Sequence, residues 1–311
     1  MKKVFLRGVL ALTLTFGFSA CMGREKNISV IAREKGSGTR EAFDKVITDG
    51  NGNFLEMKDE NGKKAYKTTL EAIEKYTTGD VKTSVGNDKN AIGYVSLGAL
   101  DDTVKVVTVN GVAPNKERVL DGSYAIQRPF VIMTNATVTL TPRAADFLNY
   151  LQSAEMQSHA ESAEVGCIYL SDPEKRAREG DAPVEVAQWA NLDSLPDGEK
   201  IKISGSSSME KLAKAAMKGY AAAYGVDGSK IFSEDYQGSS VGLKDAENDT
   251  SGNVIALSST AQTSTKIKCF NVCLDAVAVV VNQANTLVSD LTIGQLYDIY
   301  SGKIKKFSEL A

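Results

Sequence analysis

The stretch Arg33-Glu34-Lys35-Gly36-Ser37-Gly38-Thr39-Arg40 lies between an expected strand, residues 28–32, and an expected helix, residues 41–47. Small residues at such a turn leave backbone N–H groups uncovered, and free N–H groups at a helix start attract anions. Ser37 and Thr39 add hydroxyls, and Arg33 adds a cation that can grip an oxyanion with two N–H groups. The stretch predicts either an anion-binding loop or an ordinary capped turn. It is not a nucleotide P-loop, because no Gly-Lys-Ser/Thr sequence ends it.

Two later segments repeat the order strand, polar loop, helix. An expected strand at residues 201–204 runs into a serine-rich turn that contains Ser207 and Ser208. A third polar loop, residues 236–243, carries Ser239. If the three loops converge in one cleft, they form a cage of hydroxyl and amide donors with one arginine. Each charge-assisted hydrogen bond to an oxyanion contributes about 1.5–3 kcal/mol, so several together would support micromolar or tighter binding.

Strand and helix signals alternate along the whole chain, which predicts an α/β fold. The nearly continuous apolar run at residues 273–281 predicts a strand covered on both faces. Residues 66–76 are predicted to form a helix, because their apolar residues recur at helical spacing. Residues 171–200 are charged and interrupted by prolines, which indicates a linker or a surface excursion. Further strands are expected at residues 91–97, 105–109 and 130–134.

Residues 1–20 have the pattern of an export signal. A basic start with Lys2 and Arg7 precedes a short apolar core at residues 9–18. The run ends at Cys21 in a sequence that resembles a lipobox, so Cys21 is the expected site of lipid attachment. The alternative is an ordinary cleaved signal in which Cys21 has no role. No other stretch has the roughly 18 uninterrupted apolar residues that a membrane span requires. We therefore expect an exported chain, tethered to the outer face of the cell membrane or on its periplasmic side.

Charge and cysteine usage exclude several classes of protein. The formal net charge of −3 provides no basic footprint for nucleic acid. Besides Cys21 the chain contains Cys167, Cys269 and Cys273, so at least one thiol is free or pairs between chains, and Cys167 could bond to either of the others. Cys269 and Cys273 lack a second ligand pair, and His159 is the only histidine, so we predict no metal site and no cofactor.

At the polar loops the chain resembles a known family, the phosphate-binding proteins of the high-affinity phosphate ABC transporters. Residues 31–40 carry the resemblance, as do residues 203–208 (Ile-Ser-Gly-Ser-Ser-Ser) and residues 275–282 (Asp-Ala-Val-Ala-Val-Val-Val-Asn). The resemblance covers most of residues 27–170 and 200–310. Other matching stretches are residues 91–97, 109–112, 124–129 and 291–303.

The resemblance implies a two-lobed, type II periplasmic-binding-protein-like fold, in which a hinge closes both lobes over a ligand in the central cleft. It implies that the chain captures inorganic phosphate outside the cytoplasm, passes it to the permease subunits of an ABC importer, and is not an enzyme. The family's phosphate contacts fall on the following residues of this chain: Arg33, Ser37, Gly38, Thr39, Ser207, Ser208 and Ser239.

The order of the two halves departs from the family. There the Gly-Ser-Ser-Ser half usually precedes the Gly-Ser-Gly-Thr-Arg half, whereas here residues 205–208 follow residues 36–40. We interpret this as a circular permutation, with the old ends joined through residues 171–200, so the new termini should lie close together. The alternatives are a fragment of a tandem array and two chains that swap halves. Permutation predicts a discontinuous first lobe, residues 27–104 with 283–311, and a continuous second lobe, residues 105–282.

A second departure from the family concerns selectivity. The family often places a charged residue near the anion, where this chain has Ser259. Hydrogenphosphate carries a proton and needs an acceptor, whereas sulfate carries none at neutral pH. A carboxylate acceptor therefore favours phosphate and repels sulfate, and Ser259 leaves the choice between these oxyanions open. Asp275 or Glu34 could supply the acceptor; otherwise Asp275 is a strand-end cap and Glu34 is a solvated charge.

Two other functions compete with transport. One is a ligand-sensing or surface-adhesion lipoprotein that keeps the fold, which a collapsed or blocked cleft would favour. The other is a hydrolase that uses Ser207 or Ser239 as a nucleophile, which requires a positioned base. His159 is the only histidine, and it lies in a polar helical run where a solvated side chain is the simpler interpretation.

Overall fold

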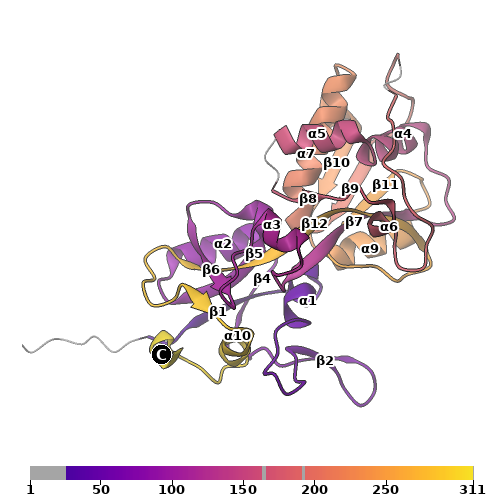
Figure 1. The fold of residues 1–311 in the computed structure, drawn as a ribbon. Helices are drawn as coiled ribbons and strands as arrows, with labels where there is room; N and C mark the ends of the chain where they lie inside the picture. Colours follow the sequence, from indigo (N-terminus) through magenta and orange to yellow (C-terminus); the bar gives the residue numbers. More distant parts are fainter. Residues whose placement is uncertain (1–25, 163–165, 191–192, 311) are drawn as a thin grey trace, which may run out of the picture.

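The computed structural model describes residues 26–162, 166–190 and 193–310. In this part of the chain strands and helices alternate and form two α/β lobes, as Figure 1 shows. The predicted α/β class and two-lobed architecture are confirmed. The expected export signal at residues 1–20 and the expected lipid-attachment residue Cys21 lie outside the described residues.

The first lobe contains the strand that leads into the loop at residues 33–40. β1 (Ser29–Arg33) pairs in parallel with β5 (Ala91–Ser96). In the core beside them Phe43 stacks on Tyr94, with ring centroids 4.2 Å apart, and Tyr300 packs against both rings. The other elements of this lobe are α1 (Gly38–Asp44), β2 (Glu56–Lys58), β3 (Lys64–Tyr66), β4 (Ile73–Lys75), α2 (Thr78–Asn87), η1 (Leu97–Ala99), β6 (Val104–Val109), α3 (Lys116–Leu120), β13 (Asp290–Leu291), α10 (Ile293–Tyr300) and η3 (Phe307–Leu310).

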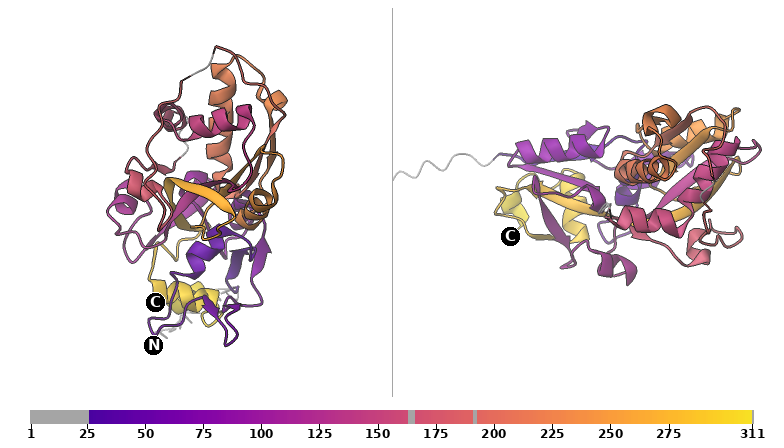
Figure 2. Two further views of the ribbon diagram at one scale, coloured as in Figure 1. Left: turned by 90° about the vertical axis from the view of Figure 1, so that its right-hand side faces the viewer. Right: turned by 90° about the horizontal axis from the view of Figure 1, so that it is seen from above.

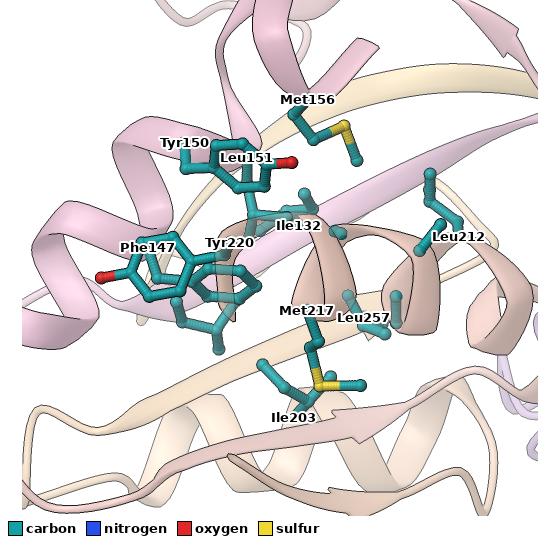
Figure 3. Close-up of a cluster of buried hydrophobic side chains, with 14 of the residues drawn as sticks. Ile132, Phe147, Tyr150, Leu151, Met156, Ile203, Leu212, Met217, Tyr220 and Leu257 are labelled. Atoms are coloured by element: carbon teal, nitrogen blue, oxygen red, sulfur yellow. The ribbon is translucent and has the colours of Figure 1, made fainter. Parts of the chain in front are cut away.

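The second lobe is built around β9 (Ile201–Gly205), which pairs in parallel with both of its neighbours. The apolar face of α7 (Glu210–Ala223) covers this sheet, and Figure 3 shows Phe147, Tyr150 and Tyr220 in the resulting core. The other elements are β7 (Gln127–Asn135), α4 (Pro142–Leu151), α5 (Ala154–Ser162), β8 (Ile168–Tyr169), α6 (Pro173–Arg176), η2 (Ser207–Met209), α8 (Gly228–Ile231), β10 (Phe232–Asp235), α9 (Ser239–Asn248) and β11 (Val254–Ser258).

One long strand, β12 (Ile267–Asn282), joins the lobes. Its first part pairs with β7 of the second lobe, and its last part pairs with β5 and β6 of the first lobe. Every residue from 275 to 282 is buried, which confirms the expectation of a strand covered on both faces. The chain also passes between the lobes where Ile126 precedes β7. The sheet therefore continues from one lobe into the other, in the order β10-β9-β11-β7-β12-β5-β1-β4.

The packing divides the chain at different points from the sequence-based division. Val107, Tyr124 and Ile126 belong to the same buried cluster as Phe43 and Tyr94 of the first lobe. The reason is that β6 pairs with the last part of β12, which completes the first lobe's sheet. The packing groups residues 27–126 with 275–310, in place of 27–104 with 283–311, and most of residues 127–274, in place of 105–282; Ile168 packs in the first lobe's cluster.

The two ends of the described chain lie side by side. The N–H of Ile28 donates to the carbonyl of Lys305 at 2.7 Å, and both views in Figure 2 show the indigo start of the described chain beside the yellow C-terminal segment. This confirms the expected proximity of the termini. The circular permutation that requires it stays a prediction.

Residues 66–76 do not form the expected helix. β3 ends at Tyr66, and Ile73 begins β4, an edge strand that pairs with β1. Leu70 and Tyr76, expected on a buried face, are exposed, with relative accessible surface areas of 103% and 66%. The apolar spacing was wrong as a helix signal because residues 73–75 extend the sheet beside β1 instead.

Residues 171–200 form a surface excursion on the second lobe, as expected for one of the two sequence-based interpretations. Within it α6 is short, and Arg176 is buried, where its guanidinium donates to the carbonyls of Leu170 and Val184 at 3.1 Å each. Trp189 donates its indole N–H to Asp146 at 3.0 Å. The excursion is therefore anchored by side chains at both ends.

Candidate anion-binding site

The first loop forms as the sequence predicts. Ser37 caps α1, and its Oγ accepts the N–H groups of Thr39 and Arg40 at 3.2 and 3.4 Å. Ser37, Gly38 and Thr39 are all buried. Building a Cβ on Gly38 would place it 2.7 Å from the Oγ atoms of both Ser239 and Ser259. Glycine is therefore required here, because the other lobe approaches the helix start too closely for a side chain.

Arg33 is almost fully buried at the end of β1. Its Nε and Nη2 donate to the Glu34 carboxylate at 2.9 and 3.1 Å, and Nη2 also donates to the carbonyl of Tyr76 at 2.8 Å. Its Nη1 reaches the hydroxyls of Thr39 and Thr78 at 3.4 and 3.3 Å. Burial raises the pKa of Glu34, and the Arg33 guanidinium partly opposes this shift. One edge of the guanidinium is thus fixed by a carboxylate, and the other is turned toward hydroxyls.

The second loop brings hydroxyls from the opposite lobe. The Oγ of Ser208 lies 2.9 Å from the Oγ1 of Thr39 and 3.3 Å from the Oγ1 of Thr78. The Oγ of Ser207 is buried and has no hydrogen-bond partner within the described residues. A buried hydroxyl without a partner is costly, so this atom is suited to a ligand. Ser206, which precedes them, accepts the N–H of Ser208 at 3.3 Å.

The third loop closes the cage. Gly238 has a φ of +118° and places Ser239 at the first residue of α9. The Oγ of Ser239 accepts the N–H of Ser259 at 3.0 Å and lies 3.3 Å from the Ser259 Oγ. The N–H of Ser240 donates to the carbonyl of Gly36 at 3.3 Å, which links this loop to the first one. The three loops identified in the sequence therefore converge at the junction of the lobes.

Arg128 is a site residue that sequence reasoning missed. It lies buried in β7, where its Nε and Nη2 donate to one oxygen of Asp275 at 3.0 and 2.8 Å, and its Nη1 donates to the Oγ of Ser259 at 3.0 Å. Burial raises the pKa of Asp275, and Arg128 opposes that shift. A signal was present, since Arg128 and Asp275 are opposite charges that lie next to long apolar runs, residues 129–133 and 276–281. Thr78 was also missed, because an isolated hydroxyl carries no signal, whereas Ser206 lies in the serine-rich turn but was not singled out as a ligand.

Both carboxylates considered as proton acceptors are engaged elsewhere. One oxygen of Asp275 accepts from Arg128, and the other accepts the hydroxyl of Ser96 and the N–H of Leu97 at 2.8 and 3.1 Å. Both oxygens of Glu34 accept from Arg33. Neither residue is a solvated charge, because both are buried. Their hydrogen bonds make them supports for the two arginines.

A cleft of about 450 Å³ opens between the lobes beside the cage. Ser207 and Ser208 line it, together with Thr78 of the first lobe and Phe130 of the second. Arg33, Ser37, Thr39 and Ser239 are less than 5% exposed. Among residues 26–162, 166–190 and 193–310, no group of three or more His, Cys, Asp or Glu side chains could hold a metal ion. None of the helices in those ranges has the length and apolar character to cross a membrane.

His159, the base that a hydrolase would need, lies on α5. Its ring packs against α7, where a Cβ built on Gly219 would lie 2.8 Å from the His159 Cδ2. Of the two candidate nucleophiles, Ser239 contacts the hydroxyl of Ser259, and Ser207 has no hydrogen-bond partner within the described residues.

Comparisons with known proteins show which family this chain is similar to. Residues 21–155 and 190–311 match the model of the PBP superfamily domain. The chain is 30% identical to the phosphate-binding protein PstS 2 of Streptococcus agalactiae, over 100% of both chains. It is 27% identical to the phosphate-binding protein PstS 2 of Streptococcus pneumoniae, over 99% of both.

A solved structure is similar as well. The crystal structure of a phosphate-binding protein of a phosphate ABC transporter from Streptococcus pneumoniae superposes with a TM-score of 0.61 at 28% identity, covering 92% of this chain and 100% of that one. The chain belongs to the PBP superfamily, in the family of the PstS phosphate-binding proteins.

Proposed function

We propose that this protein captures inorganic phosphate outside the cytoplasm and delivers it to the permease of an ABC importer. The observation that carries the proposal is the convergence of three loops from two lobes, in which Thr39 and Ser208 meet at 2.9 Å beside the buried Arg33. Relatives that share the whole length of the chain are named phosphate-binding proteins. A cage of hydroxyl, amide and guanidinium donors suits a tetrahedral oxyanion, because each oxygen can accept several short hydrogen bonds.

Entry of the anion requires the lobes to separate. Arg33, Ser37 and Thr39 are buried, and contacts such as Ser240 to Gly36 hold the loops of the two lobes together. The two connections between the lobes, β12 and the start of β7, would act as the hinge. Bound anion would add hydrogen bonds to both lobes and so favour the closed arrangement over the open one.

The lipid anchor, the permease and the site residues are parts of the same proposal. Attachment at Cys21 would keep the protein at the outer face of the cell membrane, where the permease takes up the anion. The phosphate ligands would be Arg33, Ser37, Gly38, Thr39, Ser207, Ser208 and Ser239, and the binding cycle involves no catalysis.

Isothermal titration of the soluble chain that begins at Met22 with phosphate tests the proposal. We expect a dissociation constant in the micromolar range or below, and a loss of at least about 100-fold in Arg33→Ala, because the guanidinium is the cage's central charge. Lys35→Ala is the matched control, since Lys35 lies in the same loop with the same charge but is exposed. Absence of phosphate binding by the unchanged protein, or equal effects of both substitutions, would contradict the proposal.

A further inference from the structure

A chain of hydrogen bonds with a fixed direction runs from Arg128 to the cage. Arg128 Nη1 donates to the Oγ of Ser259 at 3.0 Å, and the hydroxyl of Ser206 donates to the same oxygen at 2.8 Å. A serine oxygen has two lone pairs and one proton. Both lone pairs of Ser259 are therefore occupied, and its own proton must be donated onward.

The onward partner of Ser259 is Ser239. The two Oγ atoms lie 3.3 Å apart, and the Ser239 Oγ also accepts the N–H of Ser259 at 3.0 Å. Since Ser259 has no lone pair left, Ser239 accepts the bond between the hydroxyls. Both lone pairs of Ser239 are then filled, and its proton is left to point into the cage. The Arg128 guanidinium cannot lose a proton, so it always donates to Ser259. Through Ser259 it makes the Ser239 hydroxyl a hydrogen-bond donor only.

Ser37 is restricted in the same way on the opposite lobe. Its Oγ accepts the N–H groups of Thr39 and Arg40 at 3.2 and 3.4 Å, so its hydroxyl proton is also free to donate. Two of the predicted anion ligands, one from each lobe, therefore offer protons and no lone pairs. Ser207, whose hydroxyl has no partner within the described residues, can either donate or accept.

The carboxylates beside the cage do not restore a fixed acceptor. Both oxygens of Glu34 accept from Arg33, and Asp275 accepts from Arg128, Ser96 and Leu97. A carboxylate facing the anion would reject an oxyanion that has no proton to give, since their like charges repel. A hydroxyl such as Ser207 imposes no such penalty, because it can turn and donate.

We propose that this site takes the class of tetrahedral dianions without discriminating on protonation, so that sulfate binds with an affinity comparable to that of hydrogenphosphate. Ser259, held by Arg128 and Ser206, is the positioning residue that sets this specificity. The inference rests on the proposed function of the same cage. It concerns which anion is chosen rather than whether one is bound.

Parallel titrations of the chain from Met22 with phosphate and with sulfate at neutral pH test the inference. We expect dissociation constants within about tenfold of each other. Sulfate binding that is weaker than phosphate binding by more than about 100-fold would overturn the inference and leave the phosphate proposal intact. Binding of neither anion would contradict the proposed function, and the inference with it.

Substitution at Ser259 tests the mechanism separately. In Ser259→Asp the introduced carboxylate would accept from Arg128, free a lone pair of Ser239 and repel sulfate. Sulfate affinity should fall at least about 100-fold relative to phosphate affinity. Ser240→Asp is the matched control. Ser240 is exposed and directly follows Ser239 at the start of α9. There the added charge should weaken both anions alike, and an equal change of the ratio in both variants would overturn the role of Ser259.

Discussion

The Oγ1 of Thr39 in the first lobe lies 2.9 Å from the Oγ of Ser208 in the second, although 169 residues separate them in the sequence. The same Ser208 hydroxyl is 3.3 Å from Thr78, which also accepts from Arg33. One hydroxyl contact thus joins the two lobes at the point where the polar loops meet. Closure of the lobes and the geometry of the site are therefore coupled.

This coupling predicts the outcome of a double-mutant cycle. Thr39→Val and Ser208→Ala should each weaken phosphate binding about tenfold, because each removes a hydroxyl that supports both the anion and the closed state. The combined variant should lose less than the product of the two effects, since the residues share a contact. Titration calorimetry gives the values, and Thr265→Val, at an exposed position on the second lobe, is the control. Strictly multiplicative losses would show that the contact does not couple the lobes.

Comparing Ser207 with Ser204 separates the role of a buried hydroxyl in anion binding from its effect on the stability of the fold. Both Oγ atoms are buried without a partner in the described residues, but only Ser207 lines the cleft. Replacing either by alanine removes an unsatisfied polar atom, so neither variant should lose thermal stability. Only Ser207→Ala should weaken phosphate binding, by about tenfold. A similar loss of affinity in Ser204→Ala would remove the special role of Ser207.

Two neighbouring glycines should differ sharply in their tolerance of alanine. A Cβ at Gly38 would lie 2.7 Å from the hydroxyls of Ser239 and Ser259 and 2.9 Å from the backbone of Ser259, so Gly38→Ala must push the loops apart. We expect it to weaken phosphate binding at least about 100-fold. At Gly36 the Cβ would meet only the exposed side chain of Ser240, which can rotate away. Gly36→Ala should therefore bind nearly as the unchanged protein does, and equal losses would contradict the geometry.

The buried carboxyl group of Asp44, which pairs with Arg40, should make the stability of the fold depend on pH. Burial raises the pKa of Asp44 to about 6 from 3.8, in spite of the Arg40 guanidinium 3.1 Å away. Since the folded state then holds this proton more tightly than the unfolded chain, the folded state is favoured at low pH, and stability falls as pH rises from about 4 to about 6.

Because one pKa unit corresponds to about 1.4 kcal/mol, this effect of Asp44 can reach about 3 kcal/mol. Thermal unfolding of the unchanged protein and of Asp44→Asn across this pH range measures it. The difference in stability between the two should change between about pH 4 and 6 and stay constant above about pH 7. A constant difference over the whole range would contradict the raised pKa.

The structure decides between the two cysteine pairings that the sequence left open. The Sγ atoms of Cys167 and Cys273 lie 3.0 Å apart. Oxidised glutathione in excess should therefore convert these two thiols to a disulfide, while the glutathione takes up their two electrons and two protons and is reduced. Alkylation and peptide mass mapping should find Cys269 still alkylated. A disulfide that contains Cys269 would contradict this arrangement.

Much of the fold could be predicted because its signals are local. Ser37 caps α1, as the small and polar residues of the turn at residues 33–40 indicate. The strand at residues 273–281 was recognisable because its apolar run has no polar alternation. Residues 66–76 misled because apolar spacing cannot show whether a partner surface exists. The lobe boundaries could not be predicted, since they depend on where β6 pairs with β12.

The sequence by itself determined the three polar loops, because a glycine-rich turn, its cap residue and the N–H groups of the next helix are set by neighbours in the chain. Only the tertiary structure decided what the hydroxyls in these loops can do. Arg128 and Ser259 are 131 residues apart, and the pairing of β7 with both β11 and β12 brings them within 3.0 Å. The direction of a hydroxyl depends on which donors and acceptors fold against it, and that information lies in no single stretch of the chain.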